Sequence, residues 1–138
     1  YGRAITLPQI YMPPLDKDIF QRLLSCCFIG ASSVIIRRDM FDLIGYFDEN
    51  LPCCEDLDLW LRIAVRYPIY LVNDALTVKR TGKWQQLSTG IWGQDRYRIQ
   101  AYEKLLRIAD ISSYNKHLVL SAIHKKAYIL ARGGIRHR

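Results

Sequence analysis

The chain has 138 residues, of which 50% are hydrophobic and 24% charged, so it fits one folded domain and cannot be a disordered tail. Its formal net charge is +7, and a basic excess follows the last acidic residue, Asp110. No nucleic-acid motif accompanies these charges, so we interpret them as a solvated helix face, expect no nucleic-acid partner and rank a basic nucleic-acid module last. The sequence has neither the run of roughly 18 apolar residues that a membrane span needs nor a signal peptide, which indicates a cytoplasmic protein, with peripheral membrane attachment left open.

The four cysteines form two adjacent pairs, at positions 26 and 27 and at positions 53 and 54. Adjacent cysteines lack the C-x-x-C spacing of a zinc site, and hydrophobic residues are plentiful enough to build a core without disulfides. We therefore expect reduced, mostly buried thiols. The three histidines lie on or after the last predicted helix, and we interpret them as surface residues. The chain begins without an initiator Met, which we interpret as the mark of a fragment, a separately produced domain or a processed product.

The first predicted element in chain order is a short helix over residues 17–25, whose apolar residues recur at helical spacing. The β-branched run in the middle of residues 28–37 predicts a buried strand. A second helix is predicted over residues 38–44, with Gly45 ending it, and a turn follows.

The clearest predicted helix spans residues 55–67, because acidic residues lead it, basic residues close it and Trp60 lies on an apolar stripe. Asp58 and Arg62 are four residues apart, and we expect them to pair on its exposed face. Short strands are predicted over residues 69–78.

Two further helices are predicted over residues 91–109 and 112–131. Ser112 is the expected N-cap of the second of these helices, and Gly133-Gly134 its expected end.

Three segments, in this order and spacing, carry a resemblance to a known family. The first ends in Gly45-Tyr46-Phe47-Asp48-Glu49, the second is Glu55-Asp56-Leu57-Asp58-Leu59-Trp60-Leu61-Arg62, and the third is the loop of residues 79–88. They resemble the back half of family 2 glycosyltransferases of the GT-A fold. In that family a Gly-x-Phe-Asp-Glu turn, an acidic pair opening an Asp-Leu-Trp-Leu-Arg helix, and a Gly-Gly-His-x-x-Gln-Leu-Ser-type loop follow one another.

The resemblance implies an α/β fold, a partial GT-A (nucleotide-diphospho-sugar transferase-like) fold. Its small remnant sheet would combine residues 28–37 and 69–78 against the acidic helix, with a C-terminal helical pair. We expect an acceptor-side half of a catalytic domain over residues 1–90 and a C-terminal helical extension over residues 91–138. A sheet that has lost its neighbouring strands has a bare edge that invites pairing, so we predict self-association.

The acidic pair is the candidate catalytic centre. Sugar transfer with inversion needs a base that takes a proton from the acceptor hydroxyl. The family's base is the Asp of its Glu-Asp pair, which corresponds to Asp56, with Glu55 as the second candidate. We expect Asp56 to point inward at the helix start and Glu55 and Asp58 to point elsewhere. The competing interpretation is that these acids only favour a helix N-terminus.

Five further residues are candidates for substrate binding. Gly30, Ala31 and Ser32 are small and would leave room for a sugar, or would form a tight strand entry; both interpretations stay open. Where the family often has His, this chain has Lys83, whose ammonium cannot bind a metal; it would offset phosphate charge or be an exposed loop lysine, and both interpretations stay open. Trp84 would cover a sugar face or pack against the protein.

The resemblance places the donor site, with its Asp-x-Asp metal motif, in a first half that we expect this chain to lack. Asp56-Leu57-Asp58 has the same spacing but lies within a helix start, so we do not assign it. The implied partners are a nucleotide-sugar donor and a sugar or lipid-linked acceptor. A divalent metal, Mn or Mg, is expected for the full-length enzyme and none for this chain alone, which we expect not to transfer sugar.

Two hypotheses follow for the function. The first is part of an inverting glycosyltransferase of polysaccharide biosynthesis, favoured by the Glu55-Asp56 pair. The second is a degenerate, non-catalytic glycosyltransferase-like domain for binding or scaffolding, favoured by Lys83 in place of His.

Overall fold

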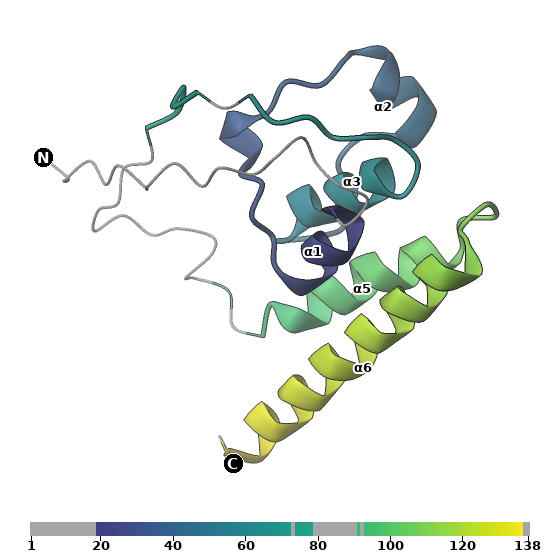
Figure 1. Ribbon diagram of the computed structural model, residues 1–138. Helices are drawn as coiled ribbons and strands as arrows, with labels where there is room; N and C mark the ends of the chain where they lie inside the picture. The colour runs from purple at the N-terminus through teal and green to yellow at the C-terminus, as the bar shows by residue number, and fades with distance from the viewer. Residues whose placement is uncertain (1–18, 73, 79–90, 92, 137–138) are drawn as a thin grey trace, which may run out of the picture.

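The computed structural model describes residues 19–72, 74–78, 91 and 93–136 (Figure 1). In these residues the elements in chain order are α1 (Ile19–Ser25), a 3-10 turn (Ala31–Ser33), α2 (Asp39–Ile44), α3 (Glu55–Ala64), α5 (Asp95–Leu106) and α6 (Ser113–Arg136).

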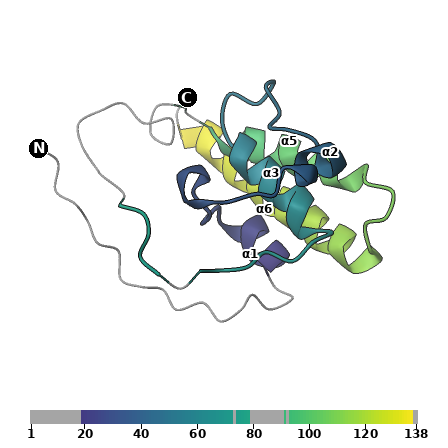
Figure 2. The same cartoon turned by 90° about the horizontal axis from the view of Figure 1, so that it is seen from above.

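The body of the described part is a pack of helices. α5 and α6 lie antiparallel along one side, α3 packs on α5, α1 packs on α3 and α6, and α2 packs on α3 (Figures 1 and 2). The core lies where α1, α3, α5 and α6 meet. Its most deeply buried hydrophobic side chains, each less than 2% exposed, are Leu23, Leu57, Leu59, Leu61, Tyr102, Leu105 and Val119.

Two buried side chains donate hydrogen bonds to backbone carbonyls, one in α1 and one in the loop after it. The Tyr102 hydroxyl on α5 donates to the Leu24 carbonyl near the end of α1, at 2.9 Å. The Trp60 indole on α3 donates to the Ile29 carbonyl, at 3.1 Å. Both rings bury a large apolar surface while their polar atoms find a partner.

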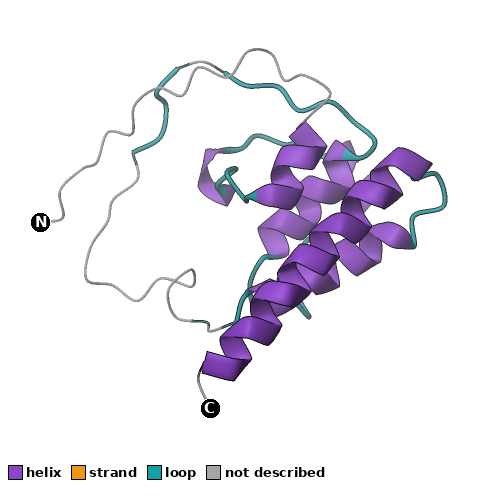
Figure 3. Cartoon of the chain, turned by 60° about the horizontal axis from the view of Figure 1, so that its bottom comes forward, coloured by secondary structure: helices purple, strands orange, loops and turns teal. Residues whose placement is uncertain are grey.

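The prediction of an α/β fold with a small remnant sheet is wrong for this part of the chain, which holds helices and loops but no strand (Figure 3). Within residues 28–37, Val34 does have extended backbone, with φ −117° and ψ 150°. Propensity therefore acts locally, but a strand also needs a neighbour that shares its N–H and C=O groups. Among the described residues, no backbone hydrogen bond joins residues 34–36 or 69–72 to another segment.

The predicted helices are confirmed, with shifted ends. The apolar residues of α1 are buried as its spacing indicated, and Gly45 ends α2 with φ 87°. The Ser112 hydroxyl accepts a hydrogen bond from the Asn115 N–H at 3.1 Å, which confirms the cap of α6. α3 ends at Ala64, three residues earlier than expected.

The expected end of α6 at Gly133-Gly134 is wrong, since the helix continues to Arg136. Glycine ends a helix when it adopts a left-handed conformation, whereas inside a helix it only costs about 1 kcal/mol relative to alanine.

The division of the chain near residue 90 stays a prediction. In the described residues, no helix is both long enough and apolar enough to span a bilayer.

Candidate active site

A strained turn presents the acidic pair at the start of α3. Cys54, directly before the helix, has φ 65° and ψ 16°, a left-handed conformation that is uncommon outside glycine. Its carbonyl accepts the first hydrogen bond of α3, from the Asp58 N–H at 3.0 Å. Strained backbone of this kind concentrates at functional sites, so the position fits an active site.

The Asp56 carboxylate has weak partners. It is half-buried; one oxygen accepts the N–H of the adjacent Leu57 at 2.7 Å, and the other contacts the Cys27 thiol at 3.8 Å. Neither Asp56 nor the half-buried Glu55 takes part in an ion pair within the described residues. Asp56 is thus a carboxylate that a substrate hydroxyl could approach without displacing a cation.

The thiols beside Asp56 are not nucleophiles. Burial and the Asp56 carboxylate raise the pKa of the Cys27 thiol to about 12. Burial and the neighbouring Cys53 raise the pKa of Cys54 to about 12. Because only the thiolate attacks, thiols with such a pKa are inert at neutral pH. All four cysteines are free, with Cys53 buried and Cys26 exposed, so three of the four are at least partly buried, as expected.

Asp58 differs sharply from Asp56, although it lies only two residues away. Its side chain is fully buried, and one oxygen lies 2.7 Å from Arg62 Nη2 and 2.9 Å from Arg62 Nε. Its other oxygen lies 2.7 Å from Lys104 Nζ of α5, an ion pair without the angle of a hydrogen bond. Asp58 and Arg62 do pair, as expected, but the expectation that they pair on the exposed face is wrong because the Asp58 carboxylate is buried.

The same charges hold the Gly-x-Phe-Asp-Glu turn against α3. The Arg62 guanidinium donates to the Ile44 carbonyl at 2.6 Å and to the Tyr46 carbonyl at 2.8 Å. Lys104 Nζ also lies 2.8 Å from Asp48, and this hydrogen bond, with those from Asn50, lowers the pKa of Asp48 to about 2. We call Asp48, Asp58, Arg62 and Lys104 the charge network; it is structural and leaves Glu55 and Asp56 free.

The described residues do not fit a divalent metal at this site. Both oxygens of Asp58 are engaged by cations, so Asp56-Leu57-Asp58 cannot act as an Asp-x-Asp metal motif. No group of three or more potential metal ligands occurs among the described residues. Asp16-Lys17-Asp18 also has the Asp-x-Asp spacing, a feature that the sequence analysis missed. It lies outside the described residues, and two prolines stand shortly before it where the family has a strand.

The small residues Gly30, Ala31 and Ser32 lie in or beside an exposed 3-10 turn. A Cβ at Gly30 would meet only Ser33 Oγ, at an ordinary 3.7 Å, and its φ of −81° suits any residue. Neither packing nor backbone geometry therefore requires glycine there, and the alternative of a tight strand entry is excluded because no strand follows. The chain that leads into this turn runs along α3, through the contacts of Cys27 and Ile29.

Two of the five candidate substrate-binding residues, Lys83 and Trp84, lie outside the described residues. Two residues near the site, Lys104 and Arg98, were not identified from the sequence. Both lie on α5, beyond the segments that carried the resemblance. The Arg98 charge partly offsets the rise in the pKa of Cys27 and Cys54. Helical spacing gives no signal for the buried Asp58, because it places Asp58 on the same face of α3 as Glu55 and Arg62.

Residues 16–88, more than half of the chain, match the family model described as glycosyltransferase like family 2. Neither a curated protein nor a solved structure matches the chain. The matched range contains the acidic pair and three members of the charge network, but it ends before Lys104.

Proposed function

Because this chain belongs to the glycosyltransferase-like family 2, we propose that it supplies the acceptor side of an inverting glycosyltransferase, with Asp56 as the base. The donor of such an enzyme is a nucleotide sugar, and the acceptor is a sugar or a lipid-linked sugar. Family membership supports glycosyl transfer as the class of reaction, and the geometry around α3 supports the choice of base.

The observation that carries the proposal is the contrast between two neighbouring carboxylates. Asp58 is buried and held by Arg62 and Lys104, so it is committed to the fold. Asp56 is half-buried, pairs with no cation in the described part, and sits on the strained turn at Cys54. A base must keep a lone pair available for the incoming hydroxyl, and of these two carboxylates only Asp56 does so.

The proton transfer proceeds on this chain's own atoms. The acceptor hydroxyl donates its hydrogen bond to Oδ2 of Asp56, the oxygen beside the Cys27 thiol, and transfers its proton there as its own oxygen attacks the anomeric carbon. The bond from that carbon to the phosphate of the nucleotide sugar breaks, and the nucleotide leaves with the electron pair. The other oxygen of Asp56 keeps the Leu57 N–H bond, which fixes the carboxylate orientation. Glu55 is the alternative base. Gly30, Ala31 and Ser32, on an exposed turn that α3 anchors through Ile29, are proposed to border the sugar.

The donor site is proposed to lie outside the described residues, and the divalent metal, Mn or Mg, is assigned to the full-length enzyme. Lys83 is proposed to offset phosphate charge, and Trp84 to cover a sugar face. The chain alone is therefore expected to transfer no sugar. Because Asp16-Lys17-Asp18 offers one Asp-x-Asp sequence, this expectation needs a direct test.

Product formation from a panel of UDP, GDP and dTDP sugars with Mn²⁺ tests the proposal in two arms. The chain alone is expected to give no product. A full-length enzyme that contains it is expected to lose at least about 100-fold in kcat on Asp56→Asn, within the usual effect of removing a general base. Glu55→Gln is the matched control and is expected to retain most of the activity.

Each arm has a contradicting result. Turnover by the chain alone, lost on substitution of Asp16 and Asp18 by Asn, would place a donor site within it. An unchanged kcat in the full-length Asp56→Asn enzyme would show that Asp56 is not the base. If no sugar donor yields product with any form of the protein, the non-catalytic binding domain becomes the better description.

A further inference from the structure

α6 carries a surface that the proposed function does not use. The helix is 24 residues long and contains five Lys or Arg residues and no acidic residue. Its length corresponds to about 36 Å at the usual rise per residue. Binding at this surface does not depend on the identity of the base.

The inner face of α6 belongs to the core. Val119 is fully buried, and Leu118, Ala122 and Ile123 pack against the core partly buried. Lys126 also faces inward and pairs with Asp95 at 3.1 Å. Because Asp95 begins α5, the turns of α6 beyond Lys126 extend past α5, as the free end of the helix in Figure 1 shows.

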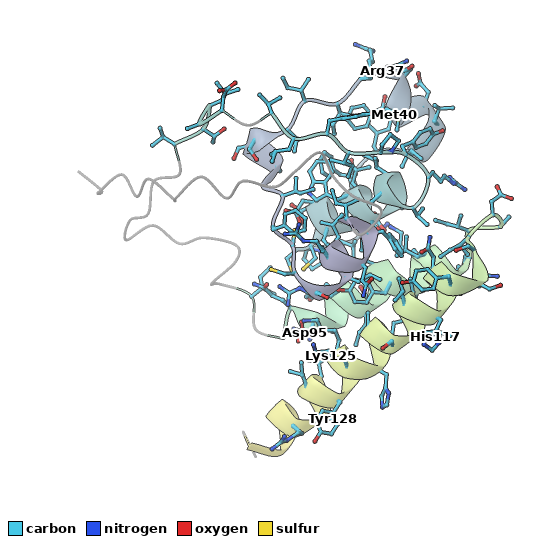
Figure 4. All side chains as sticks on the ribbon, in the orientation of Figure 1. Arg37, Met40, Asp95, His117, Lys125 and Tyr128 are labelled. Carbon is cyan, nitrogen blue, oxygen red and sulfur yellow. The ribbon has the colours of Figure 1, made fainter. Side chains whose placement is uncertain are left out.

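The outer face of α6 mixes apolar and basic side chains. Tyr114, Leu120 and Tyr128 are 65%, 54% and 57% exposed, although they are large and apolar. Exposed cations stand among them. Figure 4 shows Tyr128 on the part of α6 that extends past α5, and His117 on the side turned away from α5. We define the outer face by Tyr114, Lys116, Leu120, Lys125, Tyr128 and Arg132.

A hollow of about 190 Å³ lies at the edge of this face, between α1 and α6. Five polar side chains contribute to its lining: Gln21, Ser25, Ser121, Lys125 and Lys126. Lys125 belongs both to the hollow and to the outer face, whereas Lys126 is paired with Asp95 and the Ser25 hydroxyl donates to the Gln21 carbonyl. The Ser121 hydroxyl, the Gln21 amide and the Lys125 ammonium around one small space suit a group that carries several oxygen acceptors and a negative charge.

We propose that the outer face of α6 docks on an anionic membrane surface, with Lys125 beside the phosphate of a lipid head group in the hollow. A helix with cations and exposed aromatic and aliphatic side chains on one face has the composition of helices that lie in the membrane interface. The positive, acid-free helix complements the negative charge of such a surface. A nucleic acid would use the cations, but it would leave Leu120 and the tyrosine rings beside a charged backbone.

Sedimentation of the 138-residue chain with lipid vesicles tests the proposal. Vesicles of phosphatidylcholine with about one-third phosphatidylglycerol are expected to bind the chain, and pure phosphatidylcholine vesicles to bind it much less. Since each surface charge contributes roughly fivefold, replacing Lys116, Lys125 and Arg132 by Gln is expected to weaken binding by roughly 100-fold. The double substitution Leu120→Ser and Tyr128→Ser is expected to weaken it by about tenfold.

The matched control replaces Arg37, Arg38 and Arg66 by Gln, which removes the same charge from exposed positions elsewhere. This variant is expected to bind within about threefold of the original chain, because local rather than total charge governs docking. Equal loss in the control and the α6 variant would overturn the proposal. So would equal binding to neutral vesicles, wild-type binding by the Leu120 and Tyr128 double variant, or tighter binding to duplex or single-stranded nucleic acid at the same ionic strength.

Discussion

The helical body and the two loop segments that were predicted as strands, residues 34–36 and 69–72, differ in what their backbones need. Each helix of the body satisfies its backbone hydrogen bonds within itself and buries one face against its neighbours. The loop segments have no backbone partner in the described part and leave Ile35, Tyr70 and Val72 exposed. A helix can therefore form from a local pattern, whereas a strand forms only where a second strand is supplied.

The largest loss of stability is expected where the body depends on a buried charge. Arg62→Leu removes one of the two cations that pair with the buried Asp58, together with the hydrogen bonds to two carbonyls of the turn. Removing one partner of a buried ion pair costs about 3–5 kcal/mol, and the remaining Lys104 pair places the expected loss at the lower end of this range. Urea unfolding of this variant measures the loss. Arg66→Leu, an exposed arginine of the same segment, is the control and is expected to change the unfolding free energy by less than about 0.5 kcal/mol.

A smaller loss is expected where the body uses a neutral hydrogen bond. Tyr102→Phe keeps the ring in the core but leaves the Leu24 carbonyl without its 2.9 Å donor. An unsatisfied buried acceptor costs about 1–3 kcal/mol. Thermal or urea unfolding measures the change, and wild-type stability in Tyr102→Phe would mean that α1 and α5 are held together by packing alone.

Acid is expected to weaken the contact between Lys104 and the turn. The hydrogen bond from Lys104 holds the pKa of Asp48 at about 2, below its ordinary value of 3.8. A depressed folded-state pKa adds stability that is present above the unfolded pKa and lost as pH falls toward the folded one. Because Asp48 is partly exposed, we expect only about 1 kcal/mol to be lost between pH 5 and pH 2. Asp48→Asn should lack this part of the acid dependence; an identical pH profile for both proteins would contradict it.

The smallest effect on stability is expected in the two loop segments, residues 34–36 and 69–72. Ile35 is fully exposed, so Ile35→Ser should change the unfolding free energy by less than about 0.5 kcal/mol. The self-association predicted from a bare sheet edge is untested, and the described part has no sheet. Exposed apolar residues are the remaining reason to expect it. Light scattering at high protein concentration measures it: association that Ile35→Ser reduces would support these segments as the contact, and a monomeric wild type would contradict it.

These differences explain how far the sequence could predict the molecule. The helices were predictable because their signals are local: the spacing around Leu23 and Leu24, Gly45 after α2, and Ser112 before α6. That no strand forms at Val34 was not predictable, because propensity cannot report whether a partner is present. The candidate base was identified from a motif, and the structure leaves it available rather than testing its role.

The different roles of Asp56 and Asp58 in α3 could not be predicted from the sequence, for a similar reason. Asp56 and Asp58 look alike in a motif, and only the fold brings Lys104, 46 positions further along than Asp58, to one of them. The helical pattern does not indicate that Asp58 is buried, because it places Asp58 on the same face as Glu55 and Arg62. It also could not have supplied the second cation, since pairing across helices leaves no local trace.

The most direct test compares the unfolding free energies of Asp58→Asn and Asp56→Asn, measured side by side with urea. Asp58→Asn removes the carboxylate charge between Arg62 and Lys104 and is expected to cost about 3 kcal/mol. Asp56→Asn keeps an oxygen that can accept the Leu57 N–H and is expected to cost less than about 0.5 kcal/mol. Equal losses, or a larger loss for Asp56→Asn, would contradict the assignment of Asp58 to the fold and Asp56 to the chemistry.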